Sequence, residues 1–160
     1  MSWTYDDWMA ARCISVRQPW AWAISLAADD PDAKLVENRG AGFPASYRGL
    51  VFVHAGLQLS VRGNTDPRIL NLADDHPVAD VRGAVICVAE LADVHHDTGC
   101  CRPWGESQYV TSSGTLQAGV AHLVLEDVQR LAEPVPTRGY LGLWRARPEL
   151  VNAVRAQAPA

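Results

Sequence analysis

Short apolar stretches alternate with polar turns along this chain, and the turns are rich in Gly, Pro and Asp. The run over 83–91 is apolar at nearly every position, which is typical of a strand buried on both faces. Residues 120–131 instead alternate between apolar and polar, which predicts a strand with one face in the core. Shorter runs bounded by turn residues predict further strands. The predicted strands are 13–17, 34–39, 50–54, 83–91, 120–131 and 139–144.

Three segments have the spacing of helices. The first, 20–28, follows Pro19, which suits the first turn of a helix, and an Asp-Asp-Pro-Asp turn ends it. The second covers 57–72 with a break near 64–67, and the third covers 147–157. Unequal helices among strands joined by turns favour an α+β fold with a small mixed β-barrel rather than a regular βαβ repeat. The 160 residues fit one domain, 1–160.

Composition limits the classes of protein to which the chain can belong. Nearly half of the residues (48%) are apolar and 20% are charged, as in ordinary globular domains. We expect no membrane segment, because no apolar run approaches the roughly 18 residues of a membrane span. We also expect a cytoplasmic protein, because residues 1–12 carry Asp6 and Asp7 and lack the pattern of a secretory signal. The net charge of −4 means that any nucleic-acid contact must come from a local basic patch.

Lysine usage draws attention to one segment. The chain contains thirteen arginines and a single lysine, Lys34, and an acid and an arginine, Glu37 and Arg39, follow it within five residues. A lysine retained among so many arginines suggests a need for a compact ammonium whose pKa responds to burial. Lys34 can donate to a carbonyl or phosphate oxygen. Glu37 can accept from an exocyclic amine, and Arg39 can bind phosphate or hold Glu37 in place.

Strand geometry sets a condition on this site. In a regular strand Glu37 and Arg39 share one face, while Lys34 points to the other. The three converge only if the chain turns or bulges near Lys34, which the preceding Asp-Pro-Asp makes plausible. The alternative is an exposed, salt-bridged strand without function.

The start of the first predicted helix supplies two more candidates. Trp20 can stack on a base, although a tryptophan at a helix start more often packs in the core. Gln18 can hydrogen-bond a base edge or, equally well, orient the turn. Three further candidates border the strand at 50–54. Tyr47 and Arg48 precede it as candidate nucleic-acid contacts, and Arg48 is equally well a turn residue in solvent. His54, at its end, is a candidate base-binding residue, although a satisfied structural histidine is more common there.

Two remaining groups are weaker candidates. His95, His96, Cys100 and Cys101 lie in a polar stretch, but adjacent cysteines and adjacent histidines do not have the usual spacing of zinc ligands. The alternative is a zinc ion bound by one histidine and one cysteine of this stretch; we expect instead a mobile loop, no metal and no cofactor. Glu90, at the end of the run 83–91, is the best placed downstream acid if the protein is an enzyme.

Several segments, taken in order, resemble the ASCH domain, a family of the PUA-like superfamily. The strand and turn Ile14-Ser15-Val16-Arg17-Gln18-Pro19-Trp20-Ala21 are similar to its opening, and Lys34, Glu37 and Arg39 fit its Lys-x-x-Glu-x-Arg segment. Segments 47–56, 83–91 and 134–144 are similar in place and character, so that the resemblance covers about residues 13–145.

The resemblance implies a PUA-like fold, a small barrel flanked by helices, with a cleft between the first helix and the barrel. It also implies binding of RNA or modified bases. Some ASCH members hydrolyse N4-acetylcytidine with a lysine, a threonine three residues later and a downstream glutamate, and one group is similar to ribonucleases. This chain has Glu37 in place of that threonine. The missing hydroxyl argues against the same hydrolysis.

We therefore expect a domain that binds RNA, DNA or a nucleoside or nucleotide in a cleft around Lys34, Glu37 and Arg39. The enzyme alternative is hydrolysis of an N4-acylcytidine-type amide, or of RNA, with Lys34 and either Glu37 or Glu90 in catalytic roles. A third alternative is an interaction module in a transcription or translation assembly.

Overall fold

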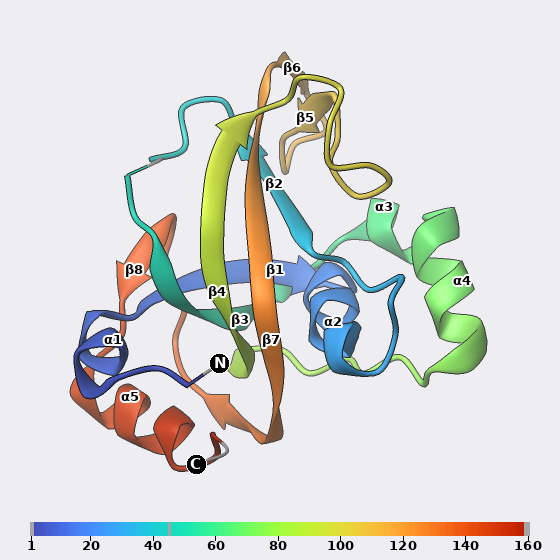
Figure 1. The fold of residues 1–160 in the computed structure, drawn as a ribbon. Helices are drawn as coiled ribbons and strands as arrows, with labels where there is room; N and C mark the ends of the chain where they lie inside the picture. Colours follow the sequence, from blue (N-terminus) through green and yellow to red (C-terminus); the bar gives the residue numbers. More distant parts are fainter. Residues whose placement is uncertain (1, 45, 159–160) are drawn as a thin grey trace.

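One mixed six-stranded sheet forms the centre of the protein in the computed structural model, which describes residues 2–44 and 46–158 (Figure 1). The strand order is β2-β7-β4-β3-β1-β8, and β1 runs parallel to β3 while every other neighbouring pair is antiparallel. A separate hairpin pairs β5 with β6. The strands are β1 Arg12–Gln18, β2 Val36–Gly40, β3 Gly49–Leu59, β4 Ala84–His96, β5 Gln108–Val110, β6 Leu116–Ala118, β7 Val120–Pro136 and β8 Leu143–Arg145.

Helices cover the two ends of the curved sheet. Both α1 and α5 pack together at one end, over a cluster around Trp8, Phe52 and Leu150. At the other end α2 and α4 pack around Trp22 and Trp104 (Figure 1). The helices are α1 Tyr5–Ala10, α2 Trp20–Ser25, the 3-10 turn η1 Leu26–Ala28, α3 Val61–Asn64, α4 Pro67–Asp75 and α5 Pro148–Arg155.

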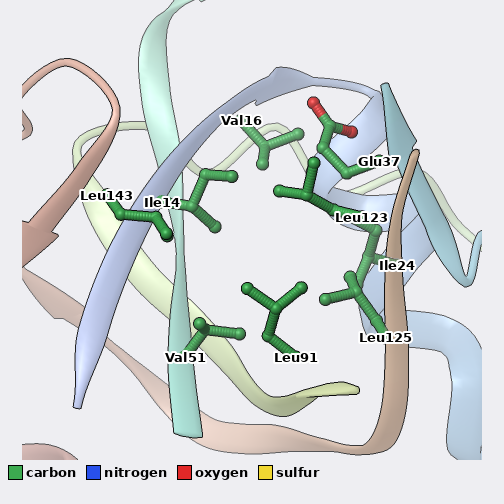
Figure 2. A pocket seen from close by; sticks show the side chains of 9 residues that line it. All are labelled: Ile14, Val16, Ile24, Glu37, Val51, Leu91, Leu123, Leu125 and Leu143. Carbon is green, nitrogen blue, oxygen red and sulfur yellow. The ribbon is translucent and has the colours of Figure 1, made fainter. Parts of the chain in front are cut away.

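Side chains from both edges of the sheet surround one interior space. Figure 2 shows nine of them, which come from α2 and from six strands, including the two edge strands β2 and β8. The space measures about 10 Å³, which is at the lower limit for a single water molecule. Side chains of the two edge strands meet around this space, which shows that the sheet curves almost back on itself.

The curvature stops short of a closed barrel. Among the described residues, backbone ladders join β2 only to β7 and β8 only to β1, so the predicted barrel is an open, strongly curved sheet. A side chain bridges the gap instead: Arg39 Nη2, on β2, donates to the Ser15 carbonyl of β1 at 2.6 Å. The α+β class predicted from the pattern is confirmed.

Most predicted elements are present, and the errors have physical reasons. The segment 57–72 was predicted as a broken helix, but β3 continues to Leu59 and two short helices follow. The apolar residues that suggested a helix there, Leu57 and Val61, are 75% and 80% exposed, so their spacing does not mark a buried face. The helix α1 was not predicted; its N-terminus is capped by Thr4 and Asp7. No helix within 2–44 and 46–158 combines the length and apolar character needed to cross a bilayer.

The interior space predicts how the protein responds to the removal of a core side chain. Leu91→Ala truncates a fully buried residue that lines the space, and we expect a loss of about 2–5 kcal/mol in the free energy of unfolding. Leu141→Ala is the matched control, because Leu141 is 99% exposed and should change stability by less than about 0.5 kcal/mol. Urea denaturation of both variants measures the difference, and equal midpoints would contradict this description of the core.

Candidate functional site

Lys34 lies just before β2, where the chain turns from η1 into the sheet. Its backbone N–H donates to the Ala23 carbonyl of α2 at 3.1 Å, and the strand begins only at Val36. Lys34 therefore lies outside the strand, where side chains alternate between the two faces, and its side chain folds back towards Val36 and Glu37. Lys34 Nζ donates to Glu37 Oε2 at 2.6 Å and to the Val36 carbonyl, and the residue is only 3% exposed. The turn that the three-residue site requires is present.

Glu37 and Arg39 complete a chain of three charges. The two residues share a face of β2, and Arg39 Nη2 lies 3.3 Å from Glu37 Oε1. Glu37 thus offers one carboxylate oxygen to the ammonium and the other to the guanidinium. Arg39 Nε is buried and has no hydrogen-bond partner among the described residues. The arrangement fixes the guanidinium across the open seam of the sheet, since the same Nη2 reaches Ser15 on β1.

Burial and charge act in opposite directions on the pKa values of this group. Burial lowers the pKa of Lys34, and the Glu37 carboxylate opposes that effect only in part. For Glu37 burial alone would raise the pKa, but Lys34 and Arg39 together outweigh it and hold the pKa below its usual value. Glu37 is therefore a carboxylate at neutral pH, and its negative charge is what retains the cation beside it.

Two tryptophans and an arginine form the neighbouring wall. The rings of Trp20, which is half-buried, and Trp104, which is buried, meet edge to face at 6.4 Å between centroids. The Arg68 guanidinium lies 5.8 Å from the Trp20 ring and 4.9 Å from the Trp104 ring. Lys34 Nζ lies 5.9 Å from the Trp20 ring. Cations at these distances interact favourably with the indole faces, which fixes the rings in place.

These residues line one open cleft of about 1330 Å³. Six basic side chains line it against two acidic ones, although the whole protein carries a net charge of −4. The basic residues are Arg17, Lys34, Arg39, Arg62, Arg68 and Arg138, and the acidic ones are Glu37 and Glu106. Four aromatic residues also line the cleft: Trp20, Trp104, Tyr109 and Tyr140.

Gln18 and His54 lie close to the cleft but are occupied by structural contacts. Gln18 is buried, and its amide donates to the Val81 carbonyl at 2.9 Å and accepts from the Trp22 N–H at 2.8 Å. These contacts orient the turn into α2, which is the structural role that the sequence left open for this residue. His54 borders the cleft and is nearly fully buried.

The two ring nitrogens of His54 have different partners. Nε2 lies 2.8 Å from the Thr137 carbonyl, and Nδ1 lies 3.0 Å from Ser15 Oγ. A carbonyl can only accept, so Nε2 carries the proton and Nδ1 accepts from the serine. Burial lowers the pKa of His54, which keeps the ring neutral. The backbone of Gly139 covers the pair, because a Cβ there would lie 2.5–2.7 Å from both side chains.

Three other candidates lie away from the cleft. Tyr47 donates to the Leu50 carbonyl at 2.7 Å. Arg48 pairs with Asp93 at 3.1 Å, and Glu90 accepts from the indole N–H of Trp3 at 2.9 Å. None of the three lines the cleft, so the structure does not bring them together with Lys34.

Several cleft residues were missed from the sequence alone. Arg68 follows Pro67 at the start of α4, and Trp104 lies in a polar loop where no apolar periodicity predicts burial. The sequence signal that could have identified Trp104 as a site residue was its isolation among Gly, Pro and charged residues. Arg17 and Arg138 could not be selected, because thirteen arginines look alike in the sequence.

The Glu37 carboxylate predicts a specific pH dependence of stability. Its pKa is lower in the folded chain, so its stabilising contribution is complete above the unfolded pKa of about 4.3 and disappears as the pH falls through the folded value. Glu37→Gln should be less stable than the wild type at pH 7 and should lose less further stability between neutral and acidic pH. Urea unfolding of both proteins at a series of pH values measures this. Parallel pH curves would contradict an ionised Glu37.

Comparison with known proteins gives a structural relationship without a sequence relationship. No protein-family model matches the chain, and no curated protein sequence does. The solved structure of ASCH from Zymomonas mobilis is similar, with 15% sequence identity, a TM-score of 0.55, and coverage of 92% of this chain and 95% of that one. Two mutant structures of the same protein match at 15% identity and TM-scores of 0.54 and 0.55, and each covers 92% of this chain. The chain therefore has the ASCH fold, as the resemblance implied.

Proposed function

We propose that this protein binds single-stranded nucleic acid, preferably RNA, or one of its nucleotides, in the cleft beside Lys34. The excess of basic over acidic side chains in the cleft of an acidic protein is the observation that supports this most directly. Such a local excess attracts a polyanion to one groove and leaves the remaining surface unattractive to it.

Two of the basic residues are placed to receive phosphate. Among the ion pairs of residues 2–44 and 46–158, none includes Arg17 or Arg138. Arg17 donates to the Gln58 side chain, and Arg138 lies 5.4 Å from the Tyr140 ring. An incoming phosphate would therefore displace no carboxylate from either guanidinium. Arg68 and Arg39 are held by Glu106, Asp66 and Glu37, which suits them to shape the wall.

The aromatic residues supply surfaces for bases. Tyr140 is exposed and Trp20 is half-buried, so each presents part of a ring to the cleft. Stacking of a base on an aromatic side chain is worth roughly 1–3 kcal/mol in single-strand sites and tolerates any base. A cleft that contains both cations and aromatic rings fits single-stranded nucleic acid better than a duplex, whose bases are already stacked.

Hydrolysis of an acylated nucleoside is the second candidate. The observation that favours it is the buried Lys34, because burial lowers the pKa of its ammonium towards the range in which an amine can act as a base. Incubation of the protein with N4-acetylcytidine, with cytidine measured by chromatography, tests this. Cytidine release that depends on Lys34 would favour the enzyme over the binding module.

The positions of Arg17 and Arg138 in the cleft lead to a prediction about how RNA binding depends on salt concentration. The double variant Arg17→Gln/Arg138→Gln should bind fluorescently labelled single-stranded RNA more weakly than the wild type does, whatever the RNA sequence. The slope of log K against log salt should fall by roughly 0.7 for each phosphate that the variant no longer neutralises. Fluorescence anisotropy over a range of salt concentrations measures both quantities.

Arg145→Gln/Arg147→Gln is the matched control for that experiment, because both arginines are exposed and neither lines the cleft. It removes the same two charges as the cleft variant, so it should leave both affinity and slope near the wild-type values. Equal effects of the cleft and control substitutions would contradict binding in the cleft.

A second, independent prediction concerns the effect of Lys34 substitutions on RNA binding. Lys34→Arg should impair RNA binding nearly as much as Lys34→Ala, because a planar guanidinium does not fit the buried position between the Val36 carbonyl and Glu37. A thermal melt of each variant separates a folding defect from a specific loss of binding. Full binding by a well-folded Lys34→Arg protein would show that the ammonium itself is not required.

A further inference from the structure

Four side chains that bind metals well converge next to the loop that carries Trp104. They come from three segments: His95 on β4, Cys100 and Cys101 in the loop that follows, and His122 on β7. One ligand atom of each lies within 4.8 Å of the other three. The sequence did not group His122 with the others, because it follows them by more than twenty residues and reaches them only through the β4–β7 pairing.

The spacing is that of a tetrahedral site. His95 Nε2 lies 3.2 Å from Cys100 Sγ and 3.4 Å from Cys101 Sγ, and His122 Nδ1 lies 3.7 Å from Cys100 Sγ. Zinc bound by thiolate at about 2.3 Å and by imidazole at about 2.0–2.1 Å places such ligand atoms roughly 3.3–3.8 Å apart. The four side chains therefore need little adjustment to surround one ion.

Both imidazoles are already oriented with a lone pair towards the sulfurs. The other nitrogen of His95, Nδ1, lies 2.7 Å from the Asp93 carboxylate, and the other nitrogen of His122, Nε2, lies 2.8 Å from the Glu106 carbonyl. Both partners are acceptors, so these nitrogens carry the protons. His95 Nε2 and His122 Nδ1 are then the unprotonated atoms, and both face the cysteines. Carboxylate or carbonyl support of this kind is usual behind histidine ligands of zinc.

The loop backbone explains how two adjacent cysteines reach one point. Cys101 has a φ of +64°, a left-handed conformation that turns the chain between the two side chains. Arg102 ties the loop together by donating to Asp97 and to the carbonyls of Cys100 and Gly105. Gly105 closes it, because a Cβ there would lie 2.7–2.8 Å from Cys101 and His122. Of the stretch expected to be a loop, His95 and His96 instead belong to β4, and Cys100 and Cys101 lie in a hydrogen-bonded turn beside the buried His122.

We propose that His95, Cys100, Cys101 and His122 bind one divalent transition-metal ion, Zn²⁺, as a closed four-ligand site. Two thiolates and two imidazoles are a ligand set typical of structural zinc. Both sulfurs bind as thiolates, so a cysteine that is still a thiol releases its proton to solvent as the ion enters. All four positions are filled by the protein, and none is left for a substrate or a reactive water.

The metal would stiffen the wall of the cleft. The loop that carries the two cysteines continues directly into Trp104 and Glu106, and Asn38 on β2 holds both. Asn38 Nδ2 donates to the Trp104 carbonyl at 2.9 Å, and its Oδ1 accepts from the Glu106 N–H at 2.8 Å. An ion that ties this loop to β4 and β7 therefore also fixes Trp104 against β2. The metal site itself rests on its own ligands and does not depend on what the cleft binds.

The test uses the full chain, purified under reducing conditions from cells grown with added zinc. We expect one zinc per chain by elemental analysis. After chelation, addition of Co²⁺ should give the visible bands of a tetrahedral, thiolate-bound ion. Chelation should also lower the melting temperature by several degrees, since an ion that binds only the folded chain stabilises it.

Variants separate the site from adventitious metal. Cys100→Ser and His95→Gln should each lose stoichiometric zinc, while His96→Gln, which changes the exposed neighbouring histidine, should retain it. Asp93→Asn should weaken metal affinity about 10–100-fold through His95. Asp93 also pairs with Arg48, so Arg48→Gln is its control and should bind as tightly as the wild type.

Three results would overturn the proposal. The first is a folded, reduced wild-type protein that takes up neither zinc nor Co²⁺. The second is unchanged metal content in both Cys100→Ser and His95→Gln. The third is a wild-type protein in which mass spectrometry finds Cys100 and Cys101 joined as a disulfide that reduction does not convert into a metal-binding form.

Discussion

A buried carboxylate between two cations holds the open seam of the sheet together. Glu37 holds Lys34 on one side and Arg39 on the other, and Arg39 reaches across to β1 where no backbone ladder of the described residues joins the edges of the sheet. Removing one member of such a group leaves an unpaired buried charge, which typically costs about 3–5 kcal/mol. The group therefore stabilises the seam of the sheet while keeping a dense set of polar atoms at the cleft.

The cleft follows from that seam. Residues of β1 and β2, on the two sides of the seam, line the cleft, and α2, α4 and the loop around Trp104 form walls beside it. Carboxylates hold Arg39 and Arg68 inside these walls, and Arg17 and Arg138 remain at the rim. Positive charge is in this way concentrated in one groove of an acidic protein, which is the basis for proposing a nucleic-acid ligand.

The cleft and the histidine–cysteine cluster share a wall. Trp104 packs towards Trp20 and Arg68 on one side, while its loop returns to the cysteines and to His122 on the other. Asn38 connects the same loop to the strand that carries Glu37 and Arg39. A change at the cluster can therefore reach the cleft through this one loop.

The α+β class, most strands, and the grouping of Lys34, Glu37 and Arg39 could be predicted before the structure was known, because they depend on local periodicity and on residues close together in the chain. The sequence also indicated the turn that lets Lys34 meet Glu37. Three-dimensional packing alone shows that the sheet stays open and that Arg68 and Trp104 line the cleft. It also shows that His122 meets the cysteines, and that Tyr47, Arg48 and Glu90 lie elsewhere. Those outcomes depend on strand pairing and on loops that bring distant residues together. The spacing of residues along the sequence does not predict which of these distant residues will be in contact.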